Sequence, residues 1–209
     1  LPKAMAPYKQ DTLIGNSLIM LSQCVRYVHV TVGHKKAMLS EYLMNKGVDS
    51  IFNTEGHGNS WWISNTLMKL LNEPVLVLTT DNITELDIGF LQNEYSRLGS
   101  PPCMLVPVIP IPGVEGDYIE QTNGIVRSLQ RQVPMDIYSS GIQVLNPSRV
   151  YALVGDKENF IDIWNCLIQS NELTSSNIYP KLWFSIDTLE NLAKAQNVSA
   201  HLPNESNKL

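Results

Sequence analysis

Two aspartates stand directly after apolar segments that have the composition of β-strands. Asp81 follows residues 75–78 and two threonines, and Asp187 follows residues 182–186. Ligands bind just outside the carboxyl ends of the strands in open parallel α/β sheets. A carboxylate at that place can hold a hard cation such as Mg²⁺, and two carboxylates can share one cation that binds phosphate oxygens. Each aspartate could instead be a helix N-cap, and their separation in sequence says nothing about their separation in space.

A lysine and a glycine-containing loop are further candidates for anion binding. Lys3 lies between Pro2 and Pro7 and could neutralise a phosphate as a point charge, although an isolated lysine is by default a solvated surface residue. The loop 54–60 contains two glycines and ends at Asn59 and Ser60, where the next helix is expected to begin. Such a loop can bind an anion through backbone N–H groups at the helix N-terminus. The alternative is an ordinary strand-to-helix connection.

Ser140 and Gly141 interrupt an otherwise apolar predicted strand at residues 138–145. A glycine at such a position lets the backbone come close to a ligand, but it is also typical of a β-bulge. Both interpretations stay open from the residues alone.

Helices and strands alternate along the chain. We expect helices at 11–24, 35–46, 61–71, 87–98, 160–171 and 188–197, and strands at 27–33, 48–53, 75–78, 103–111, 138–145 and 182–186, with a hairpin within 118–133. The alternation predicts an α/β fold with a mostly parallel sheet and helices on both faces. The strand at 75–78 is expected to be buried on both faces, and Pro107 and Pro110 predict that 103–111 is an edge or bulged strand. We predict one domain, residues 1–198, followed by a polar tail, 199–209.

Composition limits the partners. The chain has 209 residues and a net charge of −5 without a basic cluster, which disfavours duplex nucleic acid and anionic membranes as partners. No apolar run approaches the length of a membrane span. Three widely spaced cysteines favour a reduced, cytoplasmic protein. Motifs for zinc binding, hydride transfer or acyl transfer are absent from the sequence.

Four segments, in this order, resemble motifs of the nucleoside-triphosphate transferase family, the enzymes that make nucleotide sugars. Residues 1–7 (LPKAMAP) resemble its Pro-Lys-x-Met/Leu-x-Pro segment, and residues 79–82 (TTDN) resemble its metal-binding strand end. Residues 138–147 resemble its sugar-side strand, and residues 183–192 resemble its closing motif. The resemblance extends over nearly the whole chain, to about residue 196.

The resemblance implies a Rossmann-like, three-layer αβα sandwich with a mixed, mostly parallel sheet. It implies that Asp81 and Asp187 bind Mg²⁺ and that Lys3 assists catalysis. It places the nucleotide and second substrate near five further residues, Asn59, Ser60, Thr80, Ser140 and Gly141. The implied reaction transfers a nucleoside monophosphate from a nucleoside triphosphate, with CTP or UTP favoured, to a sugar phosphate or a small phosphorylated or phosphonate alcohol such as phosphocholine, and releases pyrophosphate.

The sequence departs from the family pattern in two places. The family begins with a strand and a glycine-rich, arginine-containing loop, which we expect upstream of Leu1 in the full-length protein. Many sugar enzymes of the family carry Trp-x-Asp-Ile-Gly-Thr at the closing motif, whereas here Ser185 stands at the Asp position and Asp187 at the Gly position. This version resembles the phosphocholine and phosphonate cytidylyltransferase branch.

Two other functions are considered. The same fold could serve as a non-catalytic nucleotide- or partner-binding module. It could also be a glycosyltransferase of a related fold, but such enzymes usually carry Asp-x-Asp, whereas Asp81 is followed by Asn82 and Ile83. The base, the acceptor and the oligomeric state, for which a homo-oligomer is one option, are left open by the sequence.

Overall fold

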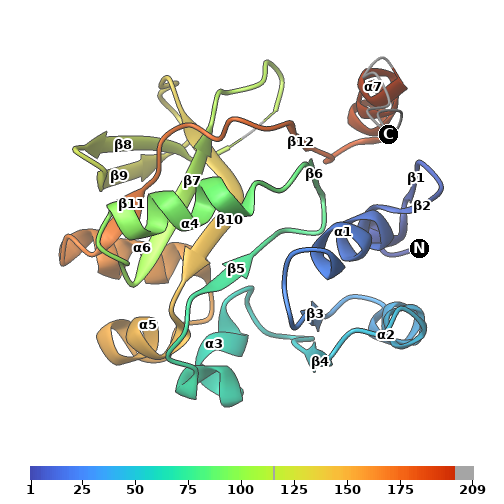
Figure 1. The fold of residues 1–209 in the computed structure, drawn as a ribbon, viewed down its shortest axis with the longest axis horizontal. Coiled ribbons are helices and arrows are strands. Elements are labelled where there is room, and N and C mark those ends of the chain that lie inside the picture. Colours follow the sequence, from blue (N-terminus) through green and yellow to red (C-terminus); the bar gives the residue numbers. More distant parts are fainter. Residues whose placement is uncertain (115, 201–209) are drawn as a thin grey trace.

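The structure is a computed structural model that describes residues 1–114 and 116–200 (Figure 1). Most of the predicted tail, from residue 201 onward, lies outside the described residues. The helices are α1 (Leu13–Ser22), α2 (Lys36–Asn45), α3 (Trp61–Asn65), α4 (Ile88–Arg97), α5 (Pro147–Val154), α6 (Phe160–Gln169) and α7 (Leu189–Ala200), with 3₁₀ helices η1 (Lys3–Met5) and η2 (Leu67–Leu70). The strands are β1 (Pro7–Tyr8), β2 (Asp11–Thr12), β3 (His29–Val32), β4 (Ser50–Asn53), β5 (Val75–Val77), β6 (Asn82–Thr84), β7 (Cys103–Val108), β8 (Tyr118–Thr122), β9 (Ile125–Gln130), β10 (Tyr138–Leu145), β11 (Leu173–Ser175) and β12 (Trp183–Ser185).

The main sheet is mixed and has the strand order β5-β10-β7-β11-β9-β8. β7 and β11 are parallel, whereas β10 runs antiparallel to β5 and β7, and β9 runs antiparallel to β11 and β8. The predicted α/β class and mixed sheet are therefore confirmed. β5, β7, β11 and β8 run in the same direction, and β10 and β9, which lie between them, run in the opposite direction. Most strands of the sheet are therefore parallel to one another, but most neighbouring pairs are antiparallel. β3 and β4 form a separate parallel pair, and β6 and β12 form an antiparallel pair.

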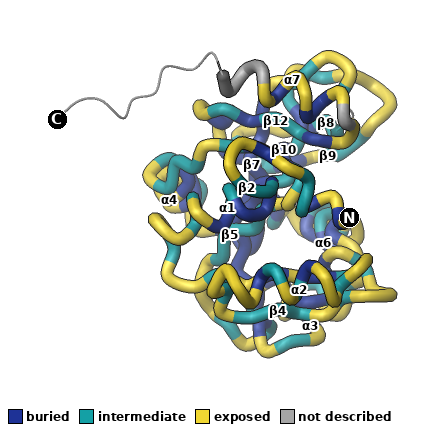
Figure 2. Tube along the Cα trace, turned by 90° about the vertical axis from the view of Figure 1, so that its right-hand side faces the viewer, coloured by how far each residue is buried: buried dark blue, intermediate teal, exposed yellow. Residues whose placement is uncertain are grey.

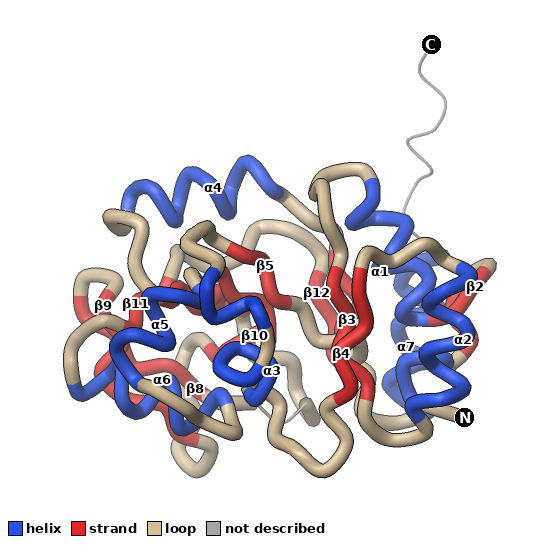
Figure 3. The backbone as a smooth tube through the Cα atoms, turned by 90° about the horizontal axis from the view of Figure 1, so that it is seen from below, coloured by secondary structure: helices blue, strands red, loops and turns tan. Residues whose placement is uncertain are grey.

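Helices cover both faces of the main sheet (Figure 3). Every residue of β7 is buried, and its side chains alternate between the two faces. Cys103 and Leu105 pack in a cluster with residues of α3, α5 and α6, whereas Met104 and Val106 pack with residues of α4. This alternation produces the three-layer arrangement expected from the sequence.

The predictions for two individual strands need correction. Of the two alternatives predicted for 103–111, the edge strand is wrong, because β7 pairs with β10 on one side and β11 on the other, whereas a bulge is present in its pairing with β10. Pro107 is tolerated there because the partner strand bulges: the pairing moves from Gln143 opposite Leu105 to Ser139 opposite Pro107. β5 was expected to be buried on both faces, but it lies at one end of the sheet order and its residues are only partly buried.

Other boundaries differ in detail. The predicted helix 61–71 divides into α3 and η2 at Thr66, whose hydroxyl accepts a hydrogen bond from the backbone N–H of Met68. The predicted hairpin is present as β8 and β9, joined through Asn123 and Gly124, which both have positive φ. Sequence reasoning missed α5, which begins with Pro147 at its first turn after the N-cap Asn146.

A smaller half of the molecule holds α1, α2, β3, β4 and α7, with the N-terminus beside them (Figure 1). Its apolar cluster joins α1 and α2 to the β3–β4 pair through Ile14, Leu18, Val30, Val32, Leu39 and Leu43. The outer face of α2 is exposed, with Leu39 and Leu43 as its buried residues (Figure 2). Within the described residues, none of the helices has both the length and the apolar character needed to cross a membrane.

The bulge in β10 depends on Gly141. Its φ is +79°, a conformation that glycine adopts more readily than any residue with a Cβ atom. A Cβ atom at this position would lie 2.9 Å from Asn82 Nδ2 and 2.9 Å from Thr79 Oγ1. The alternative that Ser140 and Gly141 mark a bulge is therefore confirmed, and the glycine is required both by its backbone conformation and by the close approach of the chain after β5.

Gly141→Ala should destabilise the protein more than Gly47→Ala. Gly47 also has a positive φ, +72°, but no atom lies within 4 Å of a Cβ built there. Gly47→Ala should therefore cost about 1 kcal/mol for the backbone conformation alone, whereas Gly141→Ala adds a steric cost and should reach roughly 3 kcal/mol. Urea denaturation of both variants measures the difference, and equal losses would contradict the close packing at Gly141.

Asp11 joins α1 to α2. Its carboxylate accepts hydrogen bonds from Lys46 Nζ at 2.6 Å, from Tyr42 Oη at 2.6 Å and from the backbone N–H of Thr12 at 2.8 Å. Thr12 is the N-cap of α1, and its hydroxyl accepts from the backbone N–H of Gly15. The hydrogen bonds from Lys46 and then Tyr42 lower the pKa of Asp11 to about 2, against the opposing effect of burial.

Asp11→Asn should lower the free energy of unfolding by about 1 kcal/mol at pH 7. Because the pKa of Asp11 is lower in the folded than in the unfolded chain, its stabilisation is complete above the unfolded value of about 4 and is lost as the pH falls toward about 2. The difference between wild type and variant, measured by urea denaturation from pH 7 to pH 3, should therefore shrink toward the acid end. Asp136→Asn, at an exposed position, is the control; a difference for Asp11→Asn that stays constant with pH would refute the assignment.

Candidate active site

The antiparallel pair of β6 and β12 brings Asp81 and Asp187 together. Ser185 lies opposite Asn82, and the backbone N–H of Ile186 donates to the carbonyl oxygen of Asp81 at 2.9 Å. Asp81 immediately precedes β6, and Asp187 lies just beyond the end of β12. Because antiparallel strands place the start of one beside the end of the other, the two aspartates lie at the same end of the pair.

Lys3 joins the two aspartates. Its Nζ atom donates to Asp81 Oδ2 at 2.9 Å and to Asp187 Oδ1 at 2.9 Å. The three residues singled out in the sequence as catalytic or metal-binding are thus in contact, although they come from the first, the middle and the last part of the chain. None of them is a helix N-cap among the caps described for this structure: Asp87, Thr12 and Asn146 fill such positions instead.

An apolar cluster holds the N-terminal segment against the β6–β12 pair. Ile83 of β6 and Ile186 beside β12 pack with Tyr8 of the first hairpin, and Leu192 of α7 belongs to the same cluster. Ala4, within η1, is buried in the neighbouring cluster of α1 and α2. Lys3 is therefore anchored by buried residues on both sides, while its side chain reaches the aspartates.

The site is partly open to solvent. The side chains of Lys3, Asp81 and Asp187 are 46%, 32% and 49% exposed. Burial acts to lower the pKa of Lys3, but the hydrogen bonds to Asp187 and Asp81 outweigh it and raise that pKa, so the amine is a cation at neutral pH. The hydrogen bond from Lys3 is also the largest cause of the lowered pKa of Asp187. The three groups together carry two negative charges and one positive charge.

Neighbouring polar groups orient the aspartates. Ser185 Oγ donates to Asp187 Oδ2 at 3.1 Å, so that each oxygen of this carboxylate has a partner. The side-chain amide of Asn82 donates to the carbonyl oxygen of Ser140, and Trp183 Nε1 donates to the same oxygen at 2.9 Å. Asn82 and Trp183 are both 8% exposed. These bonds attach both strands of the β6–β12 pair to the bulge of β10.

Sequence reasoning missed Asn82, Trp183 and Ser185 as positioning residues. The signal was present for Asn82, because a polar side chain between Asp81 and two β-forming residues must find a buried partner if the strand is buried. That partner, a backbone carbonyl on β10, could not be identified without the sheet topology.

The five residues predicted to bind substrates lie in two places. Thr80 is exposed beside Asp81, and Ser140 and Gly141 form the bulge next to Asn82. The Ser140 hydroxyl donates to the carbonyl oxygen of Val106 at 2.6 Å, so it is already used within the sheet. Contact of these residues with a substrate stays a prediction.

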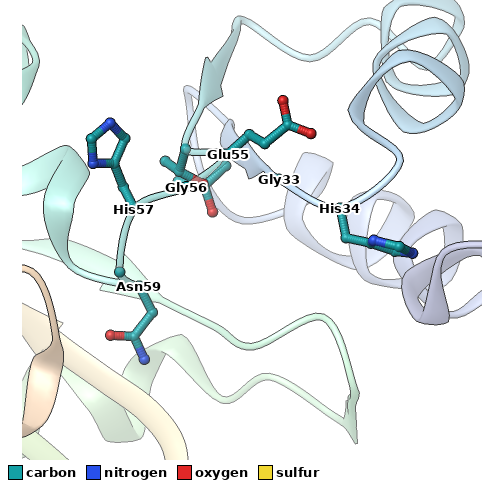
Figure 4. A pocket seen from close by; sticks show the side chains of 9 residues that line it. Gly33, His34, Glu55, Gly56, His57 and Asn59 are labelled. Carbon is teal, nitrogen blue, oxygen red and sulfur yellow. The ribbon is translucent and has the colours of Figure 1, made fainter.

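Asn59 and Ser60 belong to a second region, the loop after β4. Figure 4 shows Asn59 in this loop. Asn59 Oδ1 accepts from the backbone N–H of Phe160 at 2.9 Å, and the buried Ser60 Oγ donates to the carbonyl oxygen of Lys157 at 3.1 Å. Ser60 occupies the N-cap position of α3 without making a side-chain cap bond. Both residues attach this loop to the segment before α6, and their predicted contact with a nucleotide stays a prediction.

This loop borders an open recess of about 490 Å³ at the carboxyl ends of the parallel strands β3 and β4. The recess is lined by Thr31, Gly33, His34, Thr54, Glu55, Gly56, His57, Gly58 and Asn59. Trp61 stacks on His57 beside the recess, with ring centroids 4.3 Å apart. Backbone N–H groups in this loop are also engaged by protein: Gly58 N–H donates to Glu158 Oε2 at 2.8 Å.

The carboxylates of Asp81 and Asp187 fit a magnesium ion. Mg²⁺ prefers oxygen ligands and is commonly held by one or two carboxylates, with water and substrate phosphates completing its coordination. Here two carboxylate oxygens converge on one cationic atom, Lys3 Nζ. In the part of the chain that the structure describes, no larger group of three or more histidine, cysteine or acidic side chains forms a metal site. A cation at this place would therefore depend on its ligands from substrate and water.

Comparison with known proteins was informative at the level of structure only. No family model and no curated protein matches the sequence. Among solved structures, the chain is similar to a proposed glucose-1-phosphate thymidylyltransferase from Bacillus anthracis, with a TM-score of 0.76, 16% identity, and coverage of 96% of this chain and 87% of that chain.

Two further structures share the arrangement. The inositol-1-phosphate CTP transferase from T. maritima has a TM-score of 0.74 at 14% identity, covering 96% of this chain and 86% of that chain. The CTP:phosphocholine cytidylyltransferase from Streptococcus pneumoniae has a TM-score of 0.70 at 13% identity, covering 95% of this chain and 90% of that chain. Over nearly its whole length, this chain therefore has the fold of known nucleotidyltransferases, as the sequence motifs implied.

Proposed function

We propose that this chain is a Mg²⁺-dependent nucleotidyltransferase. It would transfer a nucleoside monophosphate from a nucleoside triphosphate to a small phosphorylated acceptor and release pyrophosphate. The observation that carries the proposal is the convergence of Lys3, Asp81 and Asp187 from three distant segments on one partly open site. The thymidylyltransferase, CTP transferase and cytidylyltransferase names of the similar structures support it.

The residues of the site would bind and orient the reacting phosphates. Asp81 and Asp187 would hold Mg²⁺, which when bound neutralises phosphate charge and orients the triphosphate. Lys3 would place a positive charge beside the α-phosphate, where charge develops during transfer. A phosphate or phosphonate oxygen of the acceptor attacks the α-phosphorus, and the bond from this phosphorus to the leaving pyrophosphate oxygen breaks. The chain needs no general base, because the attacking oxygen is already ionised at neutral pH.

The two regions of predicted binding residues suit two different substrates. The recess beside Asn59 and Ser60 lies at the carboxyl ends of parallel strands, which is the usual position of ligands in α/β folds. We assign the nucleotide to this side and the acceptor to the side of Thr80 and the β10 bulge at Ser140 and Gly141. CTP or UTP is favoured as the nucleotide.

The acceptor class follows from the closing motif. Asp187, rather than the residue at position 185, contacts Lys3, and Ser185 supports it by a hydrogen bond. This agrees with the cytidylyltransferase-like form of the motif and favours a small phosphorylated or phosphonate alcohol such as phosphocholine over a sugar phosphate. All three cysteines are free thiols, which supports a cytoplasmic protein.

Pyrophosphate release tests the proposal directly. The full-length protein is incubated with Mg²⁺, with each of CTP, UTP, GTP, ATP and dTTP, and with phosphocholine, aminoethylphosphonate or a sugar 1-phosphate. We expect release with one nucleotide–acceptor pair, most readily CTP or UTP. Nucleotide binding without release for any pair would favour a non-catalytic binding module, and transfer from a nucleotide sugar without pyrophosphate release would favour a glycosyltransferase.

Asp81→Asn and Asp187→Asn should each reduce the rate of pyrophosphate release by at least about 100-fold. Asparagine keeps the size of the side chain but removes the charge that holds the cation. Both aspartates are partly exposed, so the variants should unfold at nearly the same urea concentration as wild type. Asp136→Asn, which removes one negative charge at an exposed position, should retain the wild-type rate. Full activity in either site variant would refute the assignment of Asp81 and Asp187 as ligands of Mg²⁺.

A further inference from the structure

Lys3 occupies the position that a shared cation would take. Its Nζ atom lies 2.9 Å from one oxygen of Asp81 and 2.9 Å from one oxygen of Asp187. Mg²⁺ binds carboxylate oxygens at about 2.0–2.1 Å. An ion that bridged the same two oxygens from the side of Lys3 would overlap the ammonium group, and an ion held by these carboxylates from any side would be repelled by its charge. The lysine bridge and a metal ion shared by the two carboxylates therefore compete with one another.

The backbone of Lys3 cannot move away easily. Lys3 begins η1, and the carbonyl oxygens of Pro2 and Lys3 accept hydrogen bonds from the backbone N–H groups of Met5 and Ala6, both at 2.9 Å. Pro2 and Ala4 are buried on either side of it. A metal ion could enter only if the Lys3 side chain rotated away, and this side chain is 46% exposed and free to do so.

An anionic ligand would supply the new partner for Lys3. Rotation without such a ligand leaves the ammonium in water and exchanges two charged hydrogen bonds for hydration. A triphosphate offers the ammonium other negative oxygens, and it offers the metal additional ligands at the same time.

We propose that Lys3 excludes divalent cations from the free site, so that the metal enters together with the nucleotide. This inference rests on the proposed function, because it takes Asp81 and Asp187 as the metal ligands. It assigns Lys3 a second role besides neutralising phosphate charge: in the free protein the lysine satisfies the two carboxylates and keeps the metal affinity low.

Binding of Mn²⁺ in the absence of nucleotide tests the inference without any turnover. The EPR signal of free Mn²⁺ is followed as full-length protein is added. Lys3→Met keeps the aliphatic chain and removes the ammonium, so Mn²⁺ no longer competes with it for the carboxylates. The variant should bind Mn²⁺ more tightly than wild type, and the gain should be limited to about tenfold because exposed ion pairs are individually weak. Lys3→Gln should show a gain in the same direction.

Lys194→Met is the matched control. Lys194 is an exposed lysine that also forms a salt bridge, at 2.7 Å to Glu190 on α7, so this variant makes the same change in net charge elsewhere. Its Mn²⁺ affinity should remain close to that of wild type. The double variant Lys3→Met/Asp81→Asn should lose the gain, which would place the added affinity at Asp81.

Several outcomes would overturn the inference. Equal or weaker Mn²⁺ binding by Lys3→Met would show that Lys3 does not exclude the cation, and a gain that survives Asp81→Asn would place the ion elsewhere. Absence of Mn²⁺ binding by every variant would reject both the inference and the metal assignment. Pyrophosphate release without the gain in Mn²⁺ affinity would reject the inference but leave the proposed function intact, whereas the gain without release would reject the proposed function alone.

Discussion

The antiparallel pair of β6 and β12 fixes the distance between the two aspartates on which the candidate active site depends. Two strands of three residues each would not be stable alone. One strand carries Ile83 and the other leads into Ile186, and both side chains pack with the N-terminal hairpin and α7. Asn82 and Trp183 bind the carbonyl oxygen of Ser140. The pair therefore connects the main sheet to the smaller half of the molecule, and the aspartates lie at that connection.

The same packing explains how a lysine near the N-terminus reaches a site made late in the chain. Tyr8 and Leu13 join the cluster around Ile83 and Ile186, and Ala4 joins the cluster of α1 and α2. Burial of a large apolar side chain such as Leu13, Ile83 or Ile186 stabilises the folded protein by roughly 1.5–3 kcal/mol. An exposed ion pair contributes far less. Apolar packing thus determines the position of Lys3, and its bonds to the aspartates follow from that position.

The sequence predicted the parts of this structure that local patterns determine. The alternation of helices and strands and the aspartates at strand ends follow from residue type and spacing. The central position of β7 could not be predicted, because Pro107 is compatible with an edge or with a bulge, and only the structure shows that the bulge lies in the neighbouring strand β10. Likewise, nothing local in the sequence shows that Asp81 pairs with Ile186, since strand pairing depends on long-range packing. The motif resemblance supplied the association of Lys3, Asp81 and Asp187 that local reasoning lacked.

The site separates two physical tasks. The groups that set its geometry are buried and hydrogen-bonded: Asn82 and Trp183 donate to the carbonyl oxygen of Ser140, and the hydroxyl of Ser140 donates to the carbonyl oxygen of Val106. Buried hydrogen bonds of this kind are costly to break, because each leaves an unsatisfied polar group. The charged groups are instead partly exposed, where ion pairs are weak and partners can be exchanged. A rigid frame with exchangeable charges suits a reaction in which phosphates and a metal ion must enter and leave without disturbing the backbone that orients them.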